Sequence, residues 1–210
     1  MMKPDGIILD IDGTLWNTTS VVADAWNTVL EDRPDVPANI TAERLQQLFG
    51  KLLPEIADAL FPQLEKDDRY ALIDQCCELE HQFLRREDPD KMLFPGVPDT
   101  IRELSRTCKV FIVSNCQSGY IELFLEKTGL GSCITDFECP GYTGLGKADN
   151  IRLIVERNHL LHPVYVGDTD GDHKATRQAG IPFCHASYGF GKTEHPDYVI
   201  YRFSDLLSIF

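Results

Sequence analysis

Residues 6–14 read GIILDIDGT, an apolar run followed by two aspartates, a glycine and a threonine. An apolar run that ends in acidic residues is typical of a strand buried in a parallel sheet. Ligands of open parallel sheets bind beyond the carboxyl ends of the strands, so Asp10, Asp12 and Thr14 are expected at such a site. We therefore predict that residues 6–10 form the first strand of a parallel sheet.

The rest of the chain divides into a helical part and an alternating part. Between residues 17 and 91 apolar residues recur with helical spacing, and Pro54 is placed to begin a new helix. The helices expected there cover residues 18–31, 41–60 and 65–87. After residue 92, expected strands alternate with expected helices. The strands cover residues 109–115, 133–138, 163–168, 181–186 and 197–200, and the helices cover residues 98–106, 118–128, 147–157, 172–180 and 203–209.

This order of elements predicts an α/β fold built from two parts. Residues 1–16 and 92–210 are expected to form a three-layer α/β/α, Rossmann-like core around a parallel sheet. Residues 17–91 are expected to form an all-helical cap domain, inserted after the first strand. The predicted hinges between the two parts are residues 18–20 on one side and residues 88–96, which contain two prolines, on the other.

Composition excludes several classes of protein. The 210 residues are 43% hydrophobic and 25% charged, as in soluble globular proteins, and no apolar run reaches the ~18 residues of a membrane span. A net charge of −13 disfavours binding to nucleic acid or to anionic membranes. The seven cysteines have irregular spacing and no secretory signal precedes them, so we expect reduced thiols and a cytoplasmic protein.

Further polar residues follow the later strands. Ser114 and Asn115 end the strand over residues 109–115, Lys147 opens a helix, and the run GDTDGD covers residues 167–172. Carboxylates bind Mg²⁺, while a lysine and a hydroxyl group can hold phosphoryl oxygens. A carboxylate can also attack phosphorus, and a second carboxyl group can protonate the leaving oxygen and then activate water. Together these residues predict a phosphoryl-transfer site.

The motifs DIDGT, SN, Lys147 and GDTDGD resemble the four motifs of the haloacid dehalogenase superfamily. The flanking runs FPGVPDTIREL and AGIPFCHASYGFG are similar to the branch of phosphoglycolate phosphatases and β-phosphoglucomutases, and the resemblance covers nearly the whole chain. It implies a hydrolase of phosphate esters, a phosphatase that splits a small phosphorylated metabolite with Mg²⁺ through an aspartyl-phosphate.

The resemblance also implies catalytic roles for three residues. Asp10 is then the nucleophile, Asp12 the general acid and base, and Lys147 the lysine that orients the phosphate. The chain departs from the family where Ala148 follows the lysine instead of proline, and where Gln117 stands near the position of a frequent lysine.

The binding residues implied by the resemblance come from all four motifs. Phosphate-binding positions match Thr14, Ser114, Asn115 and Lys147. The Mg²⁺ ligands match Asp10, the backbone carbonyl of Asp12, and Asp168. Asp172 matches the second acid of the fourth motif, which is either an outer partner of the metal or a brace for Lys147.

Several alternatives stay open from the sequence. Lys51 and Trp16 are candidates for substrate specificity, although Lys51 is equally interpreted as a solvated lysine and Trp16 as packing at the hinge. Asp170 matches no invariant position and is treated as an extra acid near the site. A phosphomutase shares every core residue with a phosphatase, and a non-catalytic binding protein of the same fold is a further alternative. We expect a monomer or a homodimer.

Overall fold

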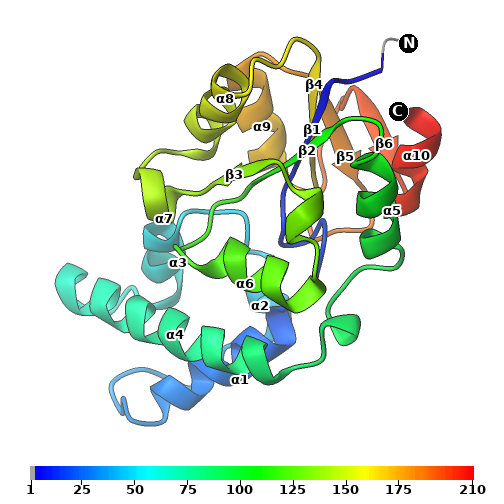
Figure 1. Cartoon of the computed structure of the whole chain (residues 1–210). Helices are drawn as coiled ribbons and strands as arrows, with labels where there is room; N and C mark the ends of the chain where they lie inside the picture. The colour runs from blue at the N-terminus through cyan, green and yellow to red at the C-terminus, as the bar shows by residue number, and fades with distance from the viewer. Residues whose placement is uncertain (1–2) are drawn as a thin grey trace.

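A parallel sheet forms the centre of the fold (Figure 1). The computed structural model describes residues 3–210, and within them six parallel strands pair in the order β3–β2–β1–β4–β5–β6. The strands are β1 (Gly6–Leu9), β2 (Lys109–Val113), β3 (Asp136–Glu138), β4 (Pro163–Gly167), β5 (Phe183–Ala186) and β6 (Tyr198–Ile200). The predicted α/β fold with a parallel sheet is confirmed. Because β1 lies between β2 and β4, the carboxyl ends of these three strands are neighbours.

Helices cover both faces of the sheet, because successive side chains of a strand point to opposite faces. Ile7 and Leu9 belong to an apolar cluster that includes residues of three helices, α5 (Val97–Leu104), α6 (Tyr120–Thr128) and α10 (Leu206–Ile209). Ile8 belongs to a second cluster, with residues of α8 (Lys147–Arg157) and α9 (Asp170–Ala179). This is the predicted three-layer arrangement.

The helices between the first two strands have an apolar core of their own. They are α1 (Thr19–Leu30), α2 (Ala42–Gln46), α3 (Leu53–Leu60) and α4 (Lys66–Arg86), and Figure 1 shows them together at the lower left. Their cluster includes Trp26, Leu45 and Leu72. The helical segment expected over residues 41–60 is divided into two helices, because Gly50 has a φ of +90° that an α-helix cannot continue. α3 begins anew, with Pro54 in its first turn.

The segments that enter and leave this helical group run side by side. The N–H of Phe94 donates to the carbonyl of Leu15 at 3.0 Å, and the N–H of Asn17 donates to the carbonyl of Met92 at 2.7 Å. The predicted boundaries between core and cap fall inside this paired segment. Both chain connections between the helical group and the sheet therefore pass through this hydrogen-bonded segment.

The remaining elements are short. They are α7 (Pro140–Thr143) and the 3-10 helices η1 (Pro89–Lys91), η2 (Gly131–Cys133) and η3 (Phe203–Asp205). The turn of η2 delays the strand expected from residue 133, which begins at residue 136. Nowhere in residues 3–210 does a helix combine the length and apolar character that crossing a bilayer requires. All seven cysteines are free thiols.

Candidate functional site

A buried lysine joins two aspartates at the carboxyl edge of the sheet. Asp10 follows β1, Lys147 is the first residue of α8, and Asp172 lies in the first turn of α9. The Lys147 ammonium donates to Oδ1 of Asp10 at 3.0 Å and also to Oδ1 of Asp172. All three side chains are at most 4% exposed. The fold thus brings together charged residues that lie 137 and 25 positions apart in the chain.

The charged groups of Asp10, Lys147 and Asp172 shift one another's pKa values. Burial lowers the pKa of Lys147, but the carboxylates of Asp10 and Asp172 outweigh burial and raise it well above its ordinary value. Burial raises the pKa of Asp10 to about 6, although the charge of Lys147 and the hydroxyl group of Ser114 both act to lower it. Lys147 therefore stays protonated, and its charge faces two carboxyl groups.

A third carboxyl group completes an acidic cluster. Asp10, Asp168 and Asp172 each offer an oxygen atom, and these atoms lie within 4.8 Å of one another. Within residues 3–210, Oδ2 of Asp10 and Oδ1 of Asp168 are buried without a hydrogen-bond partner. Burial and the two neighbouring aspartates raise the pKa of Asp168 well above its ordinary value. These carboxyl groups outnumber the one positive charge of Lys147, and some of their oxygens have no hydrogen-bond partner among the described residues. Such oxygens are suitable ligands for a hard divalent cation such as Mg²⁺.

Two glycines let the backbone approach Asp168 closely. A Cβ atom on Gly189 would lie 2.3 Å from the Cβ of Asp168, and a Cβ on Gly13 would lie 2.2 Å from its Oδ2. Gly13 also has a φ of +80°, which favours glycine. The N–H of Phe190 donates to Oδ2 of Asp168 at 2.6 Å and holds the carboxylate in this cradle.

Asp172 braces the network. Its Oδ2 accepts hydrogen bonds from the N–H of Asp168 at 3.2 Å and from the N–H and hydroxyl of Thr169 at 2.9 and 2.7 Å. The Thr169 hydroxyl in turn accepts from the N–H of Asp172 at 3.1 Å. This reciprocal cap starts α9 at residue 170 rather than at the expected residue 172. Its Oδ1 contacts Lys147, and Asp172 also belongs to the acidic cluster, so both predicted roles remain consistent with its position.

Asp12 is held by two hydroxyl groups. The Tyr120 hydroxyl donates to its Oδ1 at 2.7 Å, and the Thr18 hydroxyl donates to the same atom at 3.3 Å. Burial raises the pKa of Asp12 to about 7, and the hydrogen bond from Tyr120 limits the rise. Neither Tyr120 nor Thr18 was predicted, and no local signal marks them, because Tyr120 lies 108 positions from Asp12.

A small cavity lies between Asp12 and the helical group. Its volume is about 30 Å³, which holds roughly one water molecule. Glu80 of α4 and Trp26 of α1 line it together with Asp12, Lys51 and Gln117. The structure therefore encloses the site on the side that faces the helices.

The predicted phosphate-binding residues Thr14, Ser114 and Asn115 differ in the partners of their polar groups. The Thr14 hydroxyl and Oδ1 of Asn115 are buried and have no hydrogen-bond partner within the described residues. Ser114 is buried, and its hydroxyl group acts to lower the pKa of Asp10. The amide nitrogen of Asn115 donates to the carbonyl of Gly50 at 2.9 Å, which connects the sheet edge with the helical group.

Two residues lie outside the site. Trp16 is fully buried, with ring centroids 5.6 Å from Tyr120 and 5.0 Å from Phe124, so it packs in the core and does not line the cleft. Asp170 is exposed and forms an ion pair with Lys174 at 2.7 Å, so it is not an additional acid of the cluster. Of the two specificity candidates, only Lys51 lines the small cavity.

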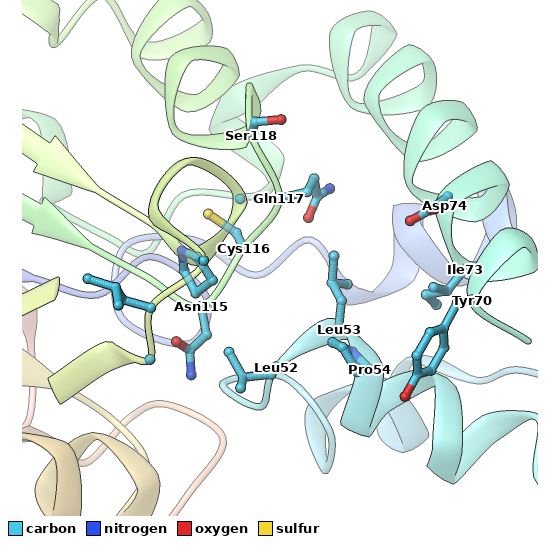
Figure 2. A pocket seen from close by; sticks show the side chains of 15 residues that line it. Leu52, Leu53, Pro54, Tyr70, Ile73, Asp74, Asn115, Cys116, Gln117 and Ser118 are labelled. Carbon is cyan, nitrogen blue, oxygen red and sulfur yellow. The ribbon is translucent and has the colours of Figure 1, made fainter. Parts of the chain in front are cut away.

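A larger cavity of about 490 Å³ adjoins the small one. Figure 2 shows its two walls, with Leu53, Pro54 and Tyr70 of the helical group facing the loop that follows β2. Leu53, Asn115, Cys116 and Gln117 line both cavities. The larger cavity thus reaches from the surface to the wall of the enclosed site.

The comparisons with known proteins agree with this geometry. The family described as haloacid dehalogenase-like hydrolase matches residues 7–186. A phosphoglycolate phosphatase of Yersinia pseudotuberculosis serotype I is 24% identical, over 96% of this chain and 91% of the relative. Pyrophosphatase PpaX of Oceanobacillus iheyensis is 23% identical, over 97% of this chain and 95% of the relative. The solved structure of a haloacid dehalogenase-like hydrolase from Streptococcus pneumoniae has a TM-score of 0.84 and 20% identity, and covers 100% of this chain and 99% of that chain.

Proposed function

We propose that this chain, which belongs to the haloacid dehalogenase-like hydrolase family, is a Mg²⁺-dependent phosphatase of a small phosphate monoester. The observation that carries the proposal is the contact of Lys147 with Asp10 and Asp172, beside the orphaned oxygens of Asp10 and Asp168. Such a cluster suits the attack of a carboxylate on a bound phosphate. The relatives named phosphoglycolate phosphatase and pyrophosphatase support phosphate esters or anhydrides as substrates.

In the first step, an oxygen of Asp10 attacks phosphorus and forms the aspartyl-phosphate. The phosphorus–oxygen bond of the ester breaks, and its electron pair stays on the leaving oxygen, which takes a proton from Asp12. The pKa of Asp12, about 7, suits this transfer because a general acid is most effective when its pKa lies near the working pH. Lys147 and Ser114 stabilise the negative charge on the phosphoryl oxygens.

In the second step, water hydrolyses the aspartyl-phosphate. Asp12, now ionised, takes a proton from the water as its oxygen attacks phosphorus. The bond between phosphorus and Asp10 breaks, which restores the carboxylate and releases inorganic phosphate. Tyr120 and Thr18 hold one oxygen of Asp12, so its other oxygen is free to carry the proton in both steps.

Asp10, the backbone carbonyl of Asp12, and Asp168 are the residues that would hold Mg²⁺. When bound, the ion would offset the repulsion between the anionic nucleophile and the anionic phosphate. The chain's own contribution is the buried pair of Asp10 and Asp168, each of which has an oxygen without a hydrogen-bond partner among the described residues and offers an oxygen to the acidic cluster.

We also propose that residues 17–91 act as a mobile cap. The small cavity lies between Asp12 and the helical group, so movement of the helical group would admit a substrate to it. The paired segment around residues 15–17 and 92–94 is the proposed hinge. Closure then excludes bulk water while the phosphoryl group is transferred.

The test is phosphate release from a panel of phosphate monoesters, with and without Mg²⁺. Wild type is compared with Asp10→Asn and with the control Asp170→Asn, since Asp170 is an exposed aspartate outside the cluster. We expect Mg²⁺-dependent release that Asp10→Asn lowers by about 10³-fold or more and that the control retains. Release that survives in Asp10→Asn would show that another group is the nucleophile. Exchange of phosphate between positions of a sugar phosphate, without release, would show a mutase instead.

A further inference from the structure

Glu80 is a buried carboxyl group in the wall of the small cavity. It lies on α4, it is 4% exposed, and the steps above assign it no task. A carboxyl group is seldom buried without a function or a partner, because burial of its charged form is costly. The same cavity is lined by Asp12, so Glu80 faces the space next to the oxygen that leaves phosphorus.

The hydrogen bonds of Glu80 leave it able to accept more. The indole N–H of Trp26 donates to its Oε2 at 2.9 Å, and the amide nitrogen of Gln117 donates to its Oε1 at 3.2 Å. Each carboxylate oxygen has two lone pairs, so each can accept a second hydrogen bond. Trp26 belongs to the helical group and Gln117 to the loop after β2, so Glu80 is positioned from both sides of the cavity.

Burial raises the pKa of Glu80 to about 8, so its carboxyl group is an anion above that pH, and the cavity then disfavours a second anion. Asp12 and Glu80 are both acidic, and Lys51 is the only basic residue among the described residues that line it. The Lys51 side chain is exposed, so its charge is screened by solvent. A carboxylate on the leaving group would be repelled by ionised Glu80 in this space, whereas a hydroxyl or ammonium group would donate a hydrogen bond to Glu80.

We propose that Glu80 determines specificity by selecting substrates whose leaving group carries a hydrogen-bond donor, a hydroxyl or an ammonium group, over substrates whose leaving group carries a carboxylate. The inference rests on the proposed function, because it places the leaving group in the cavity beside Asp12. It separates this chain from the phosphoglycolate phosphatases that it is similar to, since the leaving group of phosphoglycolate carries a carboxylate.

The experiment uses four two-carbon phosphate esters of nearly equal size. They are 2-hydroxyethyl phosphate, 2-aminoethyl phosphate, 2-phosphoglycolate and ethyl phosphate, the last of which has no polar group on its leaving carbon. The kcat/KM of each is measured with Mg²⁺ at pH 9, above the pKa of Glu80, for wild type, Glu80→Gln and the control Glu78→Gln. Glu78 is exposed on the same helix and does not line the cavity.

We expect wild type to prefer the better of the hydroxyl and ammonium esters to 2-phosphoglycolate by about 10-fold or more, the effect of one charge-assisted hydrogen bond. Whichever of the two is preferred identifies the donor. Glu80→Gln should reduce this ratio by about 10-fold, and Glu78→Gln should leave it unchanged. If Glu80 had a purely structural role, Glu80→Gln would lower the kcat/KM of all four esters together and leave their ratios unchanged. Unchanged ratios in Glu80→Gln, or a wild type that prefers 2-phosphoglycolate, would overturn the inference.

A binding measurement keeps this inference separate from the proposed function. Dissociation constants of the four esters are measured by calorimetry in the Asp10→Asn background, with and without Glu80→Gln. Tighter binding of a donor ester that Glu80→Gln removes supports the role of Glu80, even if wild type shows no turnover and the phosphatase proposal fails. Equal dissociation constants for all four esters in the Asp10→Asn protein would refute the role of Glu80, whatever the rates are.

Discussion

Replacing Lys147 by methionine should destabilise the fold by an amount that depends on pH. Methionine keeps much of the volume of the side chain but removes the charge that faces Asp10 and Asp172. Both aspartates are at most 1% exposed, so water cannot take the place of the ammonium group. Removing one partner of a buried ion pair costs about 3–5 kcal/mol, because an uncompensated charge is left inside the protein.

The direction of the pH dependence follows from the raised pKa of Asp10. That pKa is about 6 with Lys147 in place, and it must rise further when the positive charge is removed. A carboxyl group whose pKa is raised in the folded state costs stability when it is ionised, so the cost grows as the pH rises. At pH 8 the variant should lose about 3 kcal/mol of unfolding free energy. The loss should shrink below about pH 6, where Asp10 binds a proton.

Urea unfolding in the presence of a chelator, at pH 8 and at pH 5.5, measures both effects. The control is Lys174→Met, which breaks the exposed ion pair with Asp170 and should cost less than about 1 kcal/mol at either pH. Adding Mg²⁺ should restore part of the stability of Lys147→Met, since a cation that binds only the folded state stabilises it. A loss below about 1 kcal/mol at pH 8, or an equal loss at both pH values, would refute the reasoning.

Three further variants test other parts of the site. Tyr120→Phe removes a hydrogen bond that lowers the pKa of Asp12, so the pH profile of kcat/KM should move to higher pH, and an unmoved profile would contradict the role of Tyr120. Asp168→Ala should raise the Mg²⁺ concentration needed for activity by about 10-fold or more, and an unchanged titration would argue against Asp168 as a ligand. Trp16→Ala should cost about 3–5 kcal/mol in urea unfolding, because the ring is fully buried, while the ranking of substrates stays that of wild type.

Much of the fold could be predicted because its signals are local. The apolar run that ends in Asp10 and the alternation of strands with helices after residue 92 depend only on neighbouring residues. Parallel strands deliver their carboxyl ends to one edge, so acidic and hydroxyl residues at these ends predicted a site there. The meeting of Asp10, Asp168 and Asp172 follows from that rule.

Other features follow only from how distant elements pack. The pattern of a helix indicates which side chains are apolar, but it does not show which one faces a strand end far away in the chain. For this reason neither the hydroxyl of Tyr120 on Asp12 nor the place of Glu80 beside Gln117 was predicted. The same limit applies to Trp16, which could equally face a cleft or the core.

The sequence by itself therefore determined the class of fold and the residues at the strand ends, because both depend on local patterns of polarity. Only the tertiary structure decided which of these residues form hydrogen bonds and ion pairs with one another, since these interactions depend on distances of a few ångströms between elements. Lys147 contacts both Asp10 and Asp172 because α8 and α9 begin at the same edge of the sheet. The surroundings of Asp12 were likewise decided by the packing of α1 and α4, which places the buried Glu80 in the wall of the same cavity.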